Sequence, residues 1–132
     1  MNKENLKLIL NSVKTIAIVG ASPKPERDSY KVMRFLIESG YKVYPVNPNY
    51  ADNLILGKNC FSNLKDINKK IDMVNIFRQK EFVSEITKDA IKKGVKVIWT
   101  QEGIIDKVSS IMAKNAGIIF IMDECPKKVL EN

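Results

Sequence analysis

The sequence contains no histidine, and this absence excludes several kinds of site at once. Catalysis by Ser-His-Asp or Cys-His groups, and any phosphohistidine intermediate on this chain, would each need an imidazole. The two cysteines, Cys60 and Cys125, are too few for a disulfide framework, and without histidine they form no recognisable zinc cluster. We therefore expect no metal site and no catalytic centre of these classes.

Long apolar runs are also missing. No segment approaches the roughly 18 consecutive apolar residues that a membrane-spanning helix needs. The first five residues, Met-Asn-Lys-Glu-Asn, lack the apolar stretch of a secretory signal. We therefore expect a cytoplasmic protein with no membrane partner. The 132 residues, 45% of them hydrophobic, suit a single domain over residues 1–132.

Arginine is scarce in an otherwise basic chain. Lysine and arginine together number 22 against 15 acidic residues, a net charge of +7, yet the only arginines are Arg27, Arg34 and Arg78. The lysines are spread along the chain and interleaved with acids, which favours a solvated surface over a binding patch for nucleic acid. In such a chain an arginine can mark a place where a planar, forked cation is needed.

Apolar periodicity predicts alternating helices and strands. The expected helices cover residues 1–14, residues 29–40 with Ser29 as the N-cap, a stretch from about 82 to 94, and a stretch from about 104 to 117. The expected strands are residues 15–19, 41–46, 71–77, 95–99 and 118–122, with a very short one at 60–61 before a small helix near Ser62, and a polar tail at the end. Glycines 40, 94 and 117 each close a helix just before a strand.

This alternation predicts an α/β fold with three layers, in which a mainly parallel, doubly wound Rossmann-type sheet lies between helices. Parallel strands require crossover connections, and helices supply them here. In such a sheet the ligand crevice lies at the carboxyl ends of the strands, where the strand order reverses. The loops that follow the strands are therefore the places to search for a site.

The loop after the first strand begins Gly20-Ala21-Ser22 and continues through Lys24 and Arg27. It retains one glycine of the dinucleotide-binding pattern G-x-G-x-x-G and adds basic and hydroxyl side chains, a composition that suits phosphate. A purely structural turn is the alternative. No acidic residue ends the second strand, which disfavours NAD, and no G-x-x-x-x-G-K-[ST] pattern for ATP occurs.

Three further loops are expected at the same edge. Asn47-Pro48 follows the second strand, Phe77-Arg78 follows the strand at 71–77, and Gln101 and Gly103 follow the strand at 95–99. For Arg78 the alternative role is a salt bridge with a neighbouring acid such as Glu81. For the nearby Trp99 the alternative is simple core packing.

The motifs in these loops resemble those of the small stand-alone CoA-binding proteins, whose domain is similar to the N-terminal domain of the succinyl-CoA synthetase alpha subunit. The matching segments occur in family order over about residues 14–126: Ile18-Val-Gly-Ala-Ser-Pro-Lys-Pro-Glu-Arg27, Val43-Tyr-Pro-Val-Asn-Pro48, Gly57, Asp72-Met-Val-Asn-Ile-Phe-Arg78, Val97-Ile-Trp-Thr-Gln-Glu-Gly103 and Met122-Asp-Glu-Cys-Pro126. Glu124 departs from the basic residue expected before Cys125.

The resemblance implies that coenzyme A, free or acylated, is the cofactor. Its phosphate and nucleotide parts would lie near Gly20, Ala21, Ser22, Asn47, Pro48, Phe77 and Arg78. Lys24 and Arg27 would offset its negative charge, and Gln101 and Gly103 would face the pantetheine arm. No reaction follows from it, so we expect a non-catalytic CoA-binding protein. The alternatives are an acyl-CoA hydrolase or transferase, with Asp123, Glu124 and Cys125 as the nearest candidate groups, or a different, NAD-type nucleotide-binding module.

Overall fold

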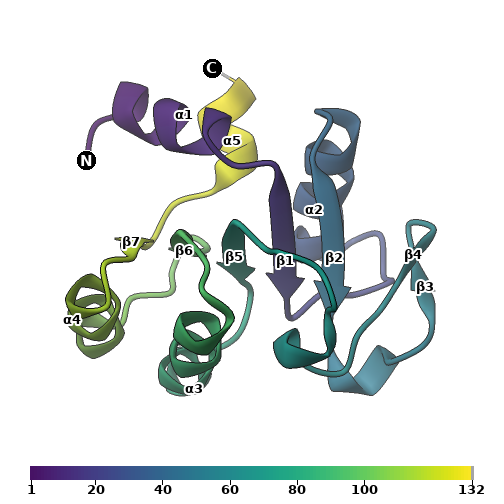
Figure 1. Ribbon diagram of the computed structural model, residues 1–132. Coiled ribbons are helices and arrows are strands. Elements are labelled where there is room, and N and C mark those ends of the chain that lie inside the picture. The colour runs from purple at the N-terminus through teal and green to yellow at the C-terminus, as the bar shows by residue number, and fades with distance from the viewer. Residues whose placement is uncertain (132) are drawn as a thin grey trace.

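A parallel five-stranded sheet is the centre of the computed structural model, which describes residues 1–131 (Figure 1). In chain order the helices and strands are α1 (Lys3–Asn11), β1 (Thr15–Val19), α2 (Asp28–Glu38), β2 (Lys42–Val46), η1 (Pro48–Tyr50), β3 (Leu54–Ile55), β4 (Lys58–Asn59), η2 (Leu64–Asp66), β5 (Met73–Ile76), α3 (Lys80–Lys93), β6 (Val97–Thr100), α4 (Lys107–Asn115), β7 (Ile119–Ile121) and α5 (Pro126–Glu131). The strand order is β2-β1-β5-β6-β7, and every pair in it is parallel. The predicted α/β, doubly wound Rossmann-type fold is confirmed.

Apolar side chains fill both sides of this sheet. One buried cluster joins it to α1, α2 and α5 and includes Leu10, Leu36 and Val129, while the other joins it to α3 and α4 and includes Val83 and Ala113. Figure 1 shows α3 and α4 beside each other, apart from α1 and α5, which lie together. Helices therefore cover both faces, which is why the central strands β1, β5 and β6 are buried along nearly their whole length instead of alternating between buried and exposed residues.

The strand ends are in register where the site is expected. Val19 of β1 pairs with Val46 of β2 and with Ile76 of β5, and Ile76 pairs with Thr100 of β6. The loops that follow these strands therefore begin at one level of the sheet. The order reverses between β1 and β5, because the chain builds outward from β1 to β2 and then returns to the other side.

The structure corrects three local predictions. Arg27, with extended dihedral angles, occupies the N-cap position of α2, so Ser29 lies inside the first turn and is not the cap. The last long helix begins at Lys107 and not near Ile104, because Thr100 Oγ1 donates to the Ile104 carbonyl and holds that residue in a turn. The tail is not merely polar, since it forms α5 and buries Val129.

The short segment between β2 and β5 is close to its prediction. The expected strand at 60–61 is a single parallel bridge between Phe61 and Val46, and the small helix starts at Leu64, slightly later than Ser62. The β3-β4 hairpin ahead of it has no counterpart in the sequence-based prediction.

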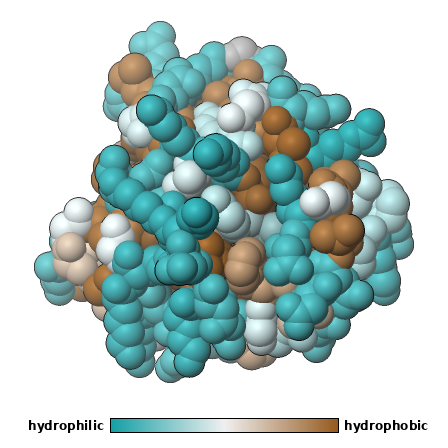
Figure 2. All heavy atoms as spheres, turned by 45° about the vertical axis from the view of Figure 1, so that its right-hand side comes forward, coloured by the Kyte–Doolittle hydropathy of each residue, from teal (hydrophilic) through white to brown (hydrophobic). Residues whose placement is uncertain are grey.

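Hydrophilic residues cover most of the surface shown in Figure 2, and apolar residues emerge among them in scattered groups. No helix in the described part of the chain combines the length and apolarity needed to cross a membrane.

Asp72 joins the amino ends of the central strands. Its Oδ2 accepts hydrogen bonds from the backbone amides of Lys14 (2.9 Å) and Thr15 (3.3 Å), and its Oδ1 lies 3.9 Å from Lys96 Nζ. Burial alone would raise the pKa of this carboxyl, but the two amide donors and the charges of Lys96 and Lys70 lower it, and the net direction is downward. The charged carboxylate is therefore the form that stabilises the fold.

Replacing Asp72 by Asn should lower the free energy of unfolding by about 1.5–3 kcal/mol at pH 7, the usual range for hydrogen bonds to a charged group. Because the folded pKa lies below the unfolded value of about 3.9, this contribution is present above about pH 5 and is lost as the pH falls through the folded pKa. Urea unfolding of both proteins across this pH range should show their difference shrinking on acidification. A difference that stays constant down to the acid transition would contradict the assignment.

Candidate functional site

The turn after β1 lies against the loops that follow β2 and β5. The backbone amide of Gly20 donates to the Val46 carbonyl (2.9 Å), and the amide of Ala21 reaches the same oxygen (3.3 Å). Gly20 has a φ of +92°, and a Cβ at this position would stand 2.7 Å from the carbonyl oxygen of Phe77. Only glycine therefore permits this packing, and the predicted convergence of the three loops is present in the structure.

The side chain of Asn47 holds these loops together by hydrogen bonds. Its Nδ2 donates to the Ala21 carbonyl (2.8 Å), while its Oδ1 accepts from the Asn49 amide (2.9 Å). Ala21 is fully buried, and Ser22 Oγ accepts from the Lys24 amide (3.1 Å). Ala21 and Asn47 shape the crevice through these contacts, whereas Ser22 lines its open part.

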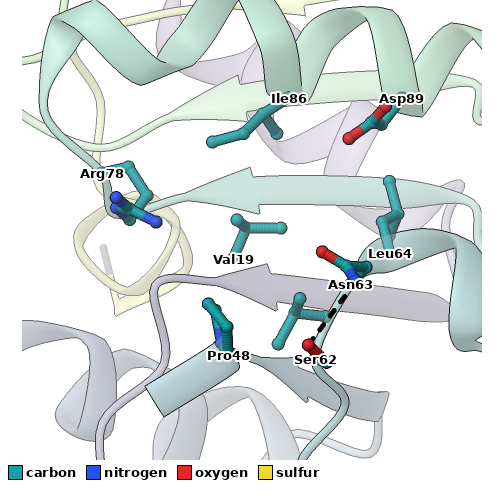
Figure 3. Close-up of a pocket in the computed structure, with 9 residues that line it drawn as sticks. Val19, Pro48, Ser62, Asn63, Leu64, Arg78, Ile86 and Asp89 are labelled. Atoms are coloured by element: carbon teal, nitrogen blue, oxygen red, sulfur yellow. Dashed lines mark hydrogen bonds between the residues drawn. The ribbon is translucent and has the colours of Figure 1, made fainter. Parts of the chain in front are cut away.

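A small pocket opens on the side of the crevice nearest α3, and we call it the α3 pocket (Figure 3). It has a volume of about 120 Å³ and is lined by Val19, Val46, Pro48, Ser62, Asn63, Leu64, Arg78, Ile86 and Asp89. Figure 3 shows Arg78 at one side and Asp89 with Asn63 at the other, while Val19 and Pro48 lie between and below them. The pocket thus has a cationic end, a carboxylate and amide end, and an apolar middle.

Arg78 is held by an aromatic ring. Its guanidinium carbon lies 4.1 Å from the ring centroid of Phe82, at the start of α3. The alternative predicted from sequence, a salt bridge with Glu81, does not form among the described residues. The guanidinium fork is therefore available to a ligand while its orientation is restrained by cation–π contact.

A larger hollow lies on the α2 side, and we call it the α2 pocket. Its volume is about 370 Å³, and it is lined by Gly20, Ser22, Glu26, Arg27, Asp28, Ser29, Phe77, Gln101, Glu102 and Ile104. Gly20 and Phe77 line this pocket and Arg78 lines the α3 pocket, so the two hollows adjoin at the switch point of the sheet. A long ligand could occupy both by crossing the carboxyl ends of β1 and β5.

Gln101 carries the clearest sign of a missing partner in the α2 pocket. The residue is 7% exposed, and among the described residues no group donates a hydrogen bond to its Oε1. A buried acceptor without a partner costs about 1–3 kcal/mol of stability. Such a group in the wall of a pocket fits a site in which a ligand supplies the donor.

Four of the predicted site residues line neither pocket: Ala21 and Asn47, which hold the loops, and Lys24 and Gly103. Lys24 is exposed on the loop between β1 and α2. The Gly103 amide donates to Asp123 Oδ1 (2.7 Å), and Asp123 has a left-handed φ of +64°. Gly103 thus supports the turn that carries Gln101, which gives it a positioning role instead of a direct place in either pocket.

Helix α5 reaches the α2 pocket through one ion pair. Lys128 Nζ lies 2.9 and 3.0 Å from the two carboxylate oxygens of Glu102. This contact with Glu102 raises the pKa of Lys128. The C-terminal helix, which the sequence predicts only as a polar tail, therefore contacts one wall of the candidate site.

Trp99 and the residues before α5 have structural contacts. Trp99 is completely buried, as its alternative role predicted, and its Nε1 donates to the Glu124 carbonyl (3.0 Å). Cys60 and Cys125 are buried free thiols, and burial raises the pKa of Cys60.

Several pocket residues were absent from the sequence-based prediction: Glu26, Asp28, Ser29, Ser62, Asn63, Ile86, Asp89, Glu102 and Ile104. The signal for Ile86 and Asp89 was present in part, because residues three apart share one face of a helix. Ser62 and Asn63 had no such signal, since the chain between β2 and β5 has no strong periodicity and is placed by its bridge to Val46.

Comparison with known proteins now identifies the family. A family model described as a CoA binding domain matches residues 14–131. The chain belongs to this CoA-binding domain family. The resemblance predicted from the sequence motifs is thereby confirmed.

Relatives of two kinds share this domain. The chain is 36% identical over 126 residues to the uncharacterized protein YneT of Bacillus subtilis, covering 96% of this chain and 92% of that protein. It is also 36% identical over 89 residues to the alpha subunit of an ADP-forming acetate–CoA ligase from Pyrococcus furiosus. That match covers 64% of this chain but only 19% of the ligase subunit.

Solved structures share the whole fold. A hypothetical protein from Pyrococcus horikoshii is 42% identical with a TM-score of 0.93, covering 99% of this chain and 91% of that one. A protein from Thermus thermophilus is 30% identical with a TM-score of 0.94, covering 99% and 98%. The CoA-binding domain thus also occurs in chains of about this length, apart from the ligases.

Replacing Gly20 by Ala should destabilise the protein by about 1–3 kcal/mol, because the new methyl group meets the Phe77 carbonyl at a φ that disfavours side chains. Thermal unfolding would measure the loss. Gly57→Ala is the matched control, since Gly57 also has a positive φ (+77°) but a Cβ there meets nothing within 4 Å. Equal losses in both variants would show that backbone strain alone, and not the contact with Phe77, makes Gly20 necessary.

Proposed function

We propose that this chain binds CoA or acyl-CoA across the carboxyl edge of its sheet and that it acts as a binding protein instead of an enzyme. The observation that carries the proposal is the pair of adjoining pockets, with the restrained Arg78 in one and the unpartnered, buried Gln101 in the other. CoA has an anionic nucleotide end and a long pantetheine arm with amide groups. The α3 pocket likewise offers a cation, Arg78, and the α2 pocket offers a hydrogen-bond acceptor, Gln101.

The nucleotide end suits the α3 pocket. Its small volume fits a flat ring better than a flexible arm, and Pro48 and Ile86 supply apolar contact. Arg78 can stack on a base or bond a phosphate, and Asp89 can accept a hydrogen bond from an exocyclic amino group. The Gly20-Ala21-Ser22 turn and Arg27 lie next along the crevice, where the pyrophosphate would pass.

The pantetheine arm suits the α2 pocket. Its two amide groups each carry an N–H donor, and Gln101 Oε1 is the buried acceptor that lacks one. Phe77 and Ile104 provide apolar surface for the methylene groups of the arm. The fit of these residues to CoA therefore rests on a donor and acceptor match as well as on charge.

The alternatives have less support. NAD would need an acid after β2, whereas Asn47 stands there and uses its side chain to hold Ala21 and Asn49. For a hydrolase or transferase the nearest groups were Asp123, Glu124 and Cys125. Asp123 accepts from Gly103, the Glu124 carbonyl accepts from Trp99, and Cys125 is 6% exposed. These contacts favour binding over turnover.

Added CoA should raise the melting temperature of the protein in proportion to the logarithm of its concentration, because only the folded state binds it. Arg78→Ala should weaken CoA binding by about 1.5–3 kcal/mol, the usual range for a hydrogen bond to a charged group. A thermal-shift series with isothermal titration would measure both. Arg34→Ala is the control, since Arg34 is 64% exposed on α2 and contacts Glu38. Stabilisation by NAD or ATP with no response to CoA would reject the proposal.

Replacing Gln101 by Met should weaken CoA binding without lowering the stability of the fold. The change removes a buried acceptor that has no partner, so the free energy of unfolding should stay the same or rise by about 1 kcal/mol. CoA should bind about 3- to 10-fold more weakly, because one hydrogen bond to the pantetheine arm is lost. Binding of ADP, which has no such arm, serves as the internal control. A loss of stability with unchanged CoA affinity would place the partner of Gln101 within the protein.

A further inference from the structure

A row of lysines lies at the opposite edge of the sheet from the CoA-binding site. Lys42 begins β2, Lys14 directly precedes β1, and Lys96 directly precedes β6. Lys70 comes shortly before β5, beside Asp72. Because β2, β1, β5 and β6 are adjacent and parallel, residues far apart in the sequence are gathered along one edge. At about 4.8 Å between strands, the row extends over roughly 15 Å.

A groove follows this row. One hollow of about 540 Å³ is lined by residues at and just before the starts of β1 and β2, among them Lys14, Thr15, Tyr41 and Lys42. A second, of about 340 Å³, is lined by Ser12, Lys14, Thr15, Lys70, Asp72 and Lys96. The two share Lys14 and Thr15, so they form one continuous depression beneath the amino ends of the strands, which we call the lysine groove.

The charge of the lysine groove is largely uncompensated. Its only acidic lining residue among those described is Asp72, which is 8% exposed, accepts from two backbone amides and pairs with Lys96 at 3.9 Å. All four lysines are exposed. No acidic group of residues 1–131 forms an ion pair with Lys14 or Lys42.

We propose that the lysine groove binds an extended acidic segment of a partner protein. Carboxylates that alternate along an extended chain lie about 6.6–6.8 Å apart on one side, a spacing that flexible lysine side chains can follow. The groove and the CoA-binding site lie at opposite ends of the strands. The two ligands can therefore be bound together, and the partner would meet the same surface whether or not CoA is present.

Nucleic acid fits this surface less well. The row contains no arginine, and the one aromatic residue in its lining, Tyr41, is partly buried with its hydroxyl donating to the Leu10 carbonyl (2.7 Å). Proteins that bind single strands stack bases on exposed aromatic rings. Duplex readers place a helix or ribbon in a groove, and this edge presents only strand ends.

An alternative role for these lysines is to offset the partial charge at helix ends, and the experiment must distinguish this role from binding. Helices α2 and α3 finish at this edge, and a helix C-terminus carries a partial negative charge that a nearby lysine can offset. If the lysines only stabilised those helix ends, their removal would lower stability and leave the affinity for the acidic segment unchanged. Both quantities therefore have to be measured on the same variants.

The test is binding of a fluorescent peptide of alternating glutamate and serine to the full chain, followed by anisotropy at several salt concentrations. The wild type should bind it with an affinity that falls as salt rises. The double variant Lys14→Glu, Lys42→Glu should bind about tenfold more weakly. The variant Lys58→Glu, Lys107→Glu, which changes the net charge equally at exposed sites elsewhere, should stay within about twofold of wild type. CoA affinity should be the same in all three proteins.

Three results would overturn the proposal. Equal weakening in the control variant would mean that total charge alone attracts the peptide. Tighter binding of a single-stranded oligonucleotide at the same salt concentration would assign the groove to nucleic acid. A lower melting temperature with unchanged peptide affinity, in this variant and in the milder Lys14→Gln, Lys42→Gln, would assign the lysines to the helix ends.

Discussion

The close approach of Gly20 to two neighbouring loops is the contact on which the crevice depends. Its amide bonds the Val46 carbonyl, and its Cα faces the Phe77 carbonyl at a separation that leaves no room for a side chain. This contact joins the ends of β2, β1 and β5 without any long side chain. Because the loops meet through their backbones, the side chains that remain, Arg78 on one side and Gln101 on the other, are free to face a ligand.

The same strand order gives the two edges of the sheet different properties. At the carboxyl edge the loops after β1, β2 and β6 are longer, and together with the short Phe77-Arg78 loop they bring amides, hydroxyls and one restrained arginine into two adjoining pockets. At the amino edge the connections are short, and lysines stand where successive strands begin. At that edge Asp72 accepts hydrogen bonds from the backbone amides of Lys14 and Thr15, so one buried carboxylate lies among the lysines and holds the starts of two strands together.

Relatives of this chain use the domain in different settings. In the acetate–CoA ligase subunit of Pyrococcus furiosus the matching part is 19% of the protein, whereas in YneT of Bacillus subtilis it is 92%. Chains of about this length therefore carry the fold with little else attached. We propose that such a chain contributes binding, with CoA at one end of the strands and a partner at the other.

The layers, the five strands of the central sheet with the helices between them, and the loops that form the crevice could be predicted from the sequence, whereas the β3-β4 hairpin and α5 could not. Apolar strands that alternate with glycine-terminated helices permit few other arrangements, since parallel strands need crossovers. The motifs at Gly20, Asn47 and Arg78 were also sufficient to indicate the family. These features are local, so a short stretch of residues contains all the information they require.

Which side chains share a pocket, and which serve other contacts, depends on the three-dimensional packing and could not be predicted from local patterns. Asn47 and Gly103 hold loops, Asp89 and Asn63 face Arg78 across the α3 pocket, and α5 returns to the α2 pocket through Lys128. The lysines are dispersed along the chain and become a row only when four strands lie side by side. Such relations depend on strand order and register, which bring together residues that no local pattern connects.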